Sequence, residues 1–157
     1  MPQSNIKMKT VQYANSVFVP KIIELLDEGH TVTINLRGYS MRPYLENNRD
    51  KALIRKIGIP RKGDIVLAET QPKVYVIHRI IKINGDDITL RGDGNMNCEY
   101  CKRSDLKGYV IGFYRKGRST LEKTNSPGWI LYSVVWNFLF PIRRYLLFIY
   151  RRLCVSE

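Results

Sequence analysis

The chain has 157 residues, enough for one domain with a normal hydrophobic core and a short additional segment. Its 26 Lys and Arg against 14 Asp and Glu give a net charge of +12, which favours an anionic partner such as lipid headgroups or nucleic acid. The three cysteines, Cys98, Cys101 and Cys154, are too few for a disulfide framework. The Cys98–Cys101 pair lacks the second ligand pair of a structural zinc site, so we expect a local disulfide or two ordinary thiols.

Residues 1–12 are expected to form an N-terminal tail. The N-terminus contains no apolar stretch, so we expect neither a secretory signal nor an N-terminal membrane anchor there. From residue 15 to residue 28, apolar side chains recur at near-helical spacing and Gly29 follows the last turn. This pattern predicts a short amphipathic helix with Asn15 or Ser16 as its N-cap. Pro20 is compatible with the helix only in its first turn.

Between residues 31 and 114 the pattern changes to short apolar runs separated by turns. Strands are predicted at 31–36, 51–55, 64–68, 73–83, 87–90 and 109–114. Segments 57–63 and 84–86 carry the Gly, Pro and Asn residues that favour turns between them. The predicted fold is therefore mainly β, an antiparallel and barrel-like domain.

Ser40 and His78 are the candidate nucleophile and base. Ser40 lies in the run GYSMRP (38–43), and His78 lies in the longest predicted strand, where alternation places it on one face with Val76 and Ile80. A hydroxyl is a weak nucleophile near neutral pH, and a nearby imidazole can accept its proton. Taken alone, however, Ser40 is more typical of a turn residue and His78 of a half-buried strand residue.

Four sequence blocks favour the catalytic interpretation. They are GYSMRP (38–43), KGDIV (62–66), IHRI (77–80) and RGDGN (91–95). In this order and spacing they resemble the signal peptidase I and LexA-like group of serine peptidases, over residues 32–114. Histidine at the base position resembles the endoplasmic-reticulum and archaeal kind of signal peptidase, whereas many bacterial enzymes have lysine there. A His with a pKa near 6.5 acts as a base with little tuning, whereas a Lys near 10.4 needs a large downward shift.

The resemblance implies a coiled antiparallel β domain that cleaves peptide bonds through an acyl-enzyme, with no metal or organic cofactor. It also implies a carboxylate that orients His78 and stabilises the imidazolium. Asp93 matches the Gly-Asp block, and Glu99 is the alternative acid. Several signal peptidases carry a hydroxyl residue where this chain has Gly38, so backbone N–H groups of Ser40 and Gly38 are expected to form the oxyanion hole. Substrates would be extended peptides with small residues near the cut, bound as an added strand.

The composition changes again after residue 118. Residues 119–127 are expected to link a peptidase domain (13–118) to a C-terminal amphipathic, helical segment (128–157). Its apolar runs are shorter than the about 20 residues that a spanning helix needs, and their aromatic residues and arginines suit the boundary of an anionic bilayer. The residues expected to contact lipid are Trp129, Trp136, Phe140, Arg143, Arg144, Arg151 and Arg152. The alternative is a helical hairpin that packs on the domain or on a partner protein.

These patterns together predict a membrane-associated serine endopeptidase, peripheral or monotopic, that cleaves a precursor or leader peptide. Its partners would be a peptide or preprotein substrate and an anionic membrane surface, with nucleic acid disfavoured. A LexA-like regulator is less favoured, because only about 30 residues precede the β domain, too few for the usual helix-turn-helix. The remaining alternative is a catalytically inert module of the same fold that binds anionic membrane or nucleic acid.

Overall fold

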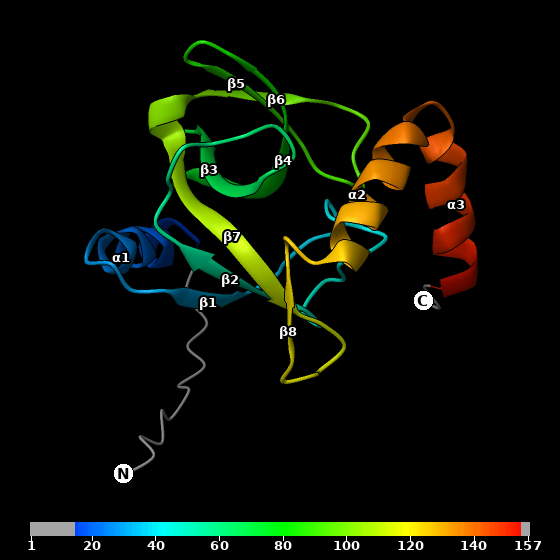
Figure 1. The fold of residues 1–157 in the computed structure, drawn as a ribbon, viewed down its shortest axis with the longest axis horizontal. Coiled ribbons are helices and arrows are strands. Elements are labelled where there is room, and N and C mark those ends of the chain that lie inside the picture. The colour runs from blue at the N-terminus through cyan, green and yellow to red at the C-terminus, as the bar shows by residue number, and fades with distance from the viewer. Residues whose placement is uncertain (1–14, 155–157) are drawn as a thin grey trace.

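The computed structural model of the protein describes residues 15–154. One antiparallel sheet carries helix α1 (Asn15–Asp27) at one end and a pair of C-terminal helices at the other end (Figure 1). Its strands are β1 (Val32–Asn35), β2 (Lys51–Arg55), β3 (Ile65–Gln71), β4 (Val74–Asn84), β5 (Asp87–Arg91), β6 (Glu99–Lys102), β7 (Leu106–Tyr114) and β8 (Leu121–Lys123). The mainly β, antiparallel fold predicted from the sequence is confirmed. The expected tail, residues 1–12, lies outside the described residues.

The strand order is β1-β2-β7-β3-β4-β5-β6, and β8 pairs with β7. Buried and partly exposed residues alternate along β7, as expected for a strand with one face on the core. One core cluster joins α1 to β1, β2 and β7, and a second lies between β3, β4 and β5. Strand β4 packs Tyr75 and Ile77, near its start, against the first cluster and Ile80 and Ile83, further along, against the second, so it borders both cores.

Helix α1 packs Val19, Ile22 and Leu26 into the first core cluster. The i, i+3, i+7 spacing of these residues places them on one helical face. Pro20 is exposed and lies beyond the first turn of the helix, which corrects the expectation for its position. The helix ends before Gly29, whose positive φ of 90° favours glycine.

Two strands differ from the sequence-based expectation. Strand β6 was missed, and β8 lies inside the segment that was expected to be a linker. In β8, Leu121 packs over Gly112 of β7, where a Cβ would come within 2.8 Å of the leucine side chain. The missing side chain at Gly112 therefore makes room for β8, and residues 121–123 belong to the sheet rather than to a linker.

The C-terminal helices are α2 (Pro127–Phe138) and α3 (Arg143–Cys154), joined by the short helix η2 (Phe140–Ile142). Ser126 caps α2 by accepting a hydrogen bond from the Trp129 N–H, and Pro127 occupies a position where no N–H is needed. Trp129 packs against the rings of Tyr44 and Phe113, which fastens α2 to the β domain. None of the helices within residues 15–154 is both long and apolar enough to cross a bilayer.

Candidate active site

Ser40 lies in the loop between β1 and β2, and hydrogen bonds hold this loop on both sides of it. The Gly38 N–H donates to Asn47 Oδ1 at 2.9 Å, and Gly38 has a φ of 81°. The Arg42 guanidinium donates to the Glu46 carboxylate at 2.8–3.1 Å. Specific polar contacts therefore hold the shape of the loop, rather than the backbone hydrogen bonds of a β-sheet, as is common for functional loops.

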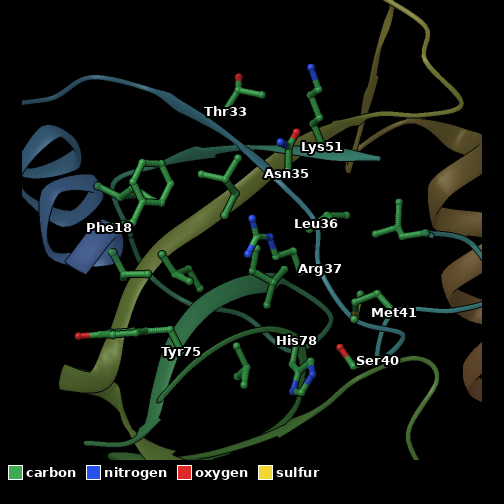
Figure 2. A pocket seen from close by; sticks show the side chains of 18 of the residues that line it. Phe18, Thr33, Asn35, Leu36, Arg37, Ser40, Met41, Lys51, Tyr75 and His78 are labelled. Carbon is green, nitrogen blue, oxygen red and sulfur yellow. The ribbon is translucent and has the colours of Figure 1, made fainter. Parts of the chain in front are cut away.

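His78 lies on β4 opposite Val66 of β3 and is only 3% exposed. Ser40 and His78 line the same cleft, and their side chains face one another there (Figure 2). No hydrogen bond joins Ser40 Oγ to the imidazole among the contacts of residues 15–154. Catalytic pairs are often longer in the absence of substrate than in the reacting complex.

The carboxylate of Glu99, at the start of β6, lies 2.7 Å from Nδ1 of His78. Since a carboxylate only accepts, Nδ1 carries the proton and Nε2 keeps its lone pair. Burial lowers the pKa of His78, and Glu99 opposes this by favouring the charged form, but burial prevails. The imidazole is consequently neutral near pH 7, as a general base must be.

Asp93 binds a different partner. Its carboxylate accepts two hydrogen bonds from Arg79, at 2.8 and 2.7 Å, and both side chains are almost fully buried. Burial disfavours the Arg79 charge, but the contact with Asp93 prevails and raises the Arg79 pKa. Because His78 and Arg79 are adjacent on a strand, they point to opposite faces. Of the two candidate acids, Glu99 therefore contacts the imidazole, and Asp93 contacts the arginine behind it.

The loop from Gly92 to Gly94 lies against the Ser40 loop. The Gly94 N–H donates to the Ser40 carbonyl at 2.7 Å. A Cβ on Gly92 would lie 2.3 Å from that carbonyl and 3.0 Å from His78 Nε2, and a Cβ on Gly94 would lie 2.6 Å from the Tyr39 carbonyl. These glycines are needed because two backbones and the imidazole meet here.

The two expected oxyanion donors differ in their surroundings. The Gly38 N–H is engaged by Asn47, whereas no hydrogen bond within residues 15–154 uses the Ser40 N–H. The Ser40 N–H is thus the donor that is available to a developing oxyanion.

The cleft beside Ser40 has a volume of about 340 Å³ and is bordered by α1, β1 and the first half of β4. Its lining combines apolar residues, among them Ile34, Leu36 and Ile77, with the charged residues Arg37, Glu46 and Lys51. Strand β1 pairs only with β2, and residues 74–78 of β4 pair only with β3 within the described chain, since β5 joins β4 from Arg79 onward. Two strand edges therefore border one cleft.

The structure corrects part of the expected lipid-contacting set. Trp129 and Trp136 are buried on the inner face of α2, and Arg143 is buried against the Trp136 and Phe140 rings and donates to the Trp136 carbonyl. Arg144, Arg151 and Arg152 are exposed, and Phe140 is half-buried.

Cys98, Cys101 and Cys154 are free thiols, and burial raises the pKa of Cys101 to about 11. Among residues 15–154, no group of three His, Cys, Asp or Glu side chains could hold a metal ion.

Sequence analysis missed Tyr132 and Trp136 as neighbours of the site. The Tyr132 hydroxyl donates to Asp93 Oδ2 at 3.0 Å, and the Trp136 indole donates to the Asp93 carbonyl at 2.8 Å. Nothing in an apolar, aromatic helix signals such bonds, because the acceptor is about 40 residues away along the chain. Comparison with protein-family models and with curated proteins gives no match for this sequence.

Proposed function

We propose that this protein is a serine endopeptidase in which Ser40 is the nucleophile, His78 the general base and Glu99 the orienting carboxylate. The observation that carries the proposal is the buried His78, bound through Nδ1 to Glu99 at 2.7 Å and facing Ser40 across the cleft. A neutral imidazole with a fixed tautomer beside a half-buried serine is the arrangement that activates a hydroxyl.

The reaction follows from this arrangement. His78 Nε2 accepts the proton of Ser40 Oγ as the oxygen attacks the peptide carbonyl, and Glu99 stabilises the imidazolium. The Ser40 N–H donates to the oxyanion. His78 then protonates the leaving amine, which yields the acyl-enzyme, and a water activated by the same imidazole releases the acid.

An extended peptide is the substrate class that the cleft supports. The edges of β1 and of residues 74–78 that pair with no strand among residues 15–154 can each supply backbone hydrogen bonds to an added strand. The apolar residues that line the cleft, which include Ile34, Leu36 and Ile77, favour apolar substrate side chains. We therefore propose that the enzyme cleaves an extended, apolar segment of a precursor or leader peptide.

Covalent labelling tests this proposal directly. The purified protein is treated with a fluorophosphonate at about pH 8, with and without lipid, and examined by intact mass spectrometry and peptide mapping. One adduct on Ser40 is expected in the wild-type protein and in Ser119→Ala, a control at an exposed serine. Ser40→Ala should give none and His78→Ala a strongly slowed adduct. A wild-type protein that stays unlabelled in both conditions would favour the inert binding module.

Peripheral attachment to an anionic membrane is the second part of the proposal. Ten large apolar residues of the C-terminal helices are 45–82% exposed, and we name them the outer hairpin surface. They are Ile130, Leu131, Val134, Val135, Phe138, Ile142, Tyr145, Phe148, Ile149 and Leu153. Exposed arginines 144, 151 and 152 flank them, and the whole chain carries a charge of +12. Apolar side chains beside guanidinium groups match the acyl and phosphate layers of an anionic bilayer.

Vesicle sedimentation tests the attachment. Phe138 and Phe148 are the aromatic residues to change, since both protrude from the outer hairpin surface. Phe138→Ser with Phe148→Ser should reduce binding to vesicles that contain anionic lipid, and added salt should weaken binding further. The control Ile59→Ser removes an apolar residue that is as exposed as Phe138 but lies outside the C-terminal helices, and it should bind vesicles as the wild type does. Equal pelleting of the double variant and the wild type would contradict this attachment.

A further inference from the structure

Helix α2 is bonded on its inner face to the loop that abuts the proposed catalytic pair. Tyr132 donates to the Asp93 carboxylate, Trp136 donates to the Asp93 carbonyl, and Ser133 Oγ accepts from Arg79 at 2.9 Å. Three of the five residues from 132 to 136 on one helix therefore bind the residues of a single buried ion pair. Tyr132 and Trp136 take up both the side chain and the backbone of Asp93.

The Asp93 loop in turn contacts the reacting groups. Gly94 donates its N–H to the Ser40 carbonyl, and Gly92 leaves no room for a side chain between that carbonyl and His78 Nε2. A displacement of Asp93 would consequently shift Gly92 and Gly94, and with them the position of the Ser40 backbone. The path from α2 to the nucleophile runs through one loop and consists of hydrogen bonds and backbone contacts.

We infer that Tyr132 and Trp136 are positioning residues of the proposed peptidase, and that α2 is a structural part of its active site rather than a separate appendage. The inference rests on the proposed function, since it assigns these residues to the Ser40 reaction. Neither residue lines the cleft, so we assign their effect on Ser40 to the hydrogen bonds that they make with Asp93.

A nearby tyrosine provides a matched control. Tyr44 belongs to the same aromatic cluster as Tyr132, with ring centroids 4.4 Å apart, and its hydroxyl also donates to a carboxylate. That carboxylate is Glu122 of β8, which has no contact with the Asp93 loop among the hydrogen bonds of the described residues. Tyr132→Phe and Tyr44→Phe therefore each remove one hydroxyl group from the same aromatic cluster, but only Tyr132→Phe removes a hydrogen bond to Asp93.

The first readout is the covalent labelling of Ser40. Its maximal rate and its half-saturating probe concentration are measured separately, well below the unfolding temperature of each variant. Tyr132→Phe should lower the maximal rate about 10- to 100-fold with little change in the half-saturating concentration, since small misplacements of reacting groups have effects of this size. Trp136→Phe, which keeps an aromatic ring, should act in the same direction. Tyr44→Phe should label at the wild-type rate, even if its melting temperature falls as much as that of Tyr132→Phe.

The second readout is hydrogen exchange of residues 92–95, which include the Gly94 amide bound to Ser40. Exchange should accelerate in Tyr132→Phe and stay unchanged in Tyr44→Phe. Normal labelling of the wild type with no difference between the two variants in either readout would overturn the inference and leave the peptidase proposal intact. A wild-type protein that is not labelled would instead contradict the peptidase proposal, and with it the assignment of Tyr132 and Trp136 as positioning residues. Accelerated exchange in Tyr132→Phe would in that case show only that α2 stabilises the Asp93 loop.

Discussion

Replacing each candidate acid separately distinguishes a catalytic carboxylate from a structural one. Glu99 accepts a hydrogen bond from an imidazole that becomes charged during the reaction, and such bonds to charged groups contribute about 1.5–3 kcal/mol. Because Glu99 is 37% exposed, water screens part of this effect. At about 1.4 kcal/mol per tenfold change, Glu99→Gln should slow Ser40 labelling about 10- to 100-fold. Its stability should remain within about 1 kcal/mol of wild type.

Asp93→Asn should reduce stability much more than Glu99→Gln does. The change leaves Arg79, whose side chain is 2% exposed, without its anionic partner, and breaking a buried ion pair in this way costs about 3–5 kcal/mol of stability. Urea denaturation monitored by tryptophan fluorescence measures this loss. Labelling should also slow, because the loop beside Ser40 loosens.

The pH dependence of labelling separates the two acids further. Glu99 raises the pKa of His78 more than Asp93 does, so Glu99→Gln should move the midpoint of the labelling profile to lower pH, and Asp93→Asn should move it less. The reasoning would be refuted if Glu99→Gln labelled at the wild-type rate while a fully stable Asp93→Asn did not label at all. That result would make Asp93 the orienting acid in the reacting state.

Three further predictions concern the imidazole, the glycine loop and the aromatic core. Burial lowers the pKa of His78 in the folded protein below its unfolded value of about 6.5. The rate of wild-type labelling should therefore rise with pH through a midpoint below pH 6.5, and the free energy of unfolding should decrease as the pH falls below 6.5. A labelling midpoint above pH 7 would contradict the assignment of His78 as the base. Gly92→Ala would bring a Cβ within 2.3 Å of the Ser40 carbonyl and should slow labelling at least about 100-fold, whereas Gly58→Ala, with open space around it, should match wild type in labelling and thermal unfolding. Trp129→Ala should lower the free energy of unfolding by about 3–5 kcal/mol in urea titration, because this buried ring joins α2 to the core; a loss below 1 kcal/mol would mean that the helix is held elsewhere.

The six strands that were expected could be predicted because alternating apolar residues define a strand with one buried face. Strands β6 and β8 were missed because they are short and lie at sheet margins, where pairing with a neighbour rather than an apolar pattern defines them. The burial of Trp129, Trp136 and Arg143 was missed for a related reason. Helical periodicity divides a helix into faces but does not state which face meets the protein.

The sequence by itself determined the antiparallel β architecture through its local pattern, and a set of short motifs singled out Ser40 and His78 as the candidate pair. Only the tertiary structure decided the partner of His78, because Glu99 reaches the imidazole through the pairing of β6 with β5, whereas Asp93 meets Arg79 on the opposite face of β4. It also decided that α2 adjoins the site. Tyr132 and Trp136 find their acceptors across about 40 residues of chain, and such distant contacts depend on how whole elements pack rather than on local sequence.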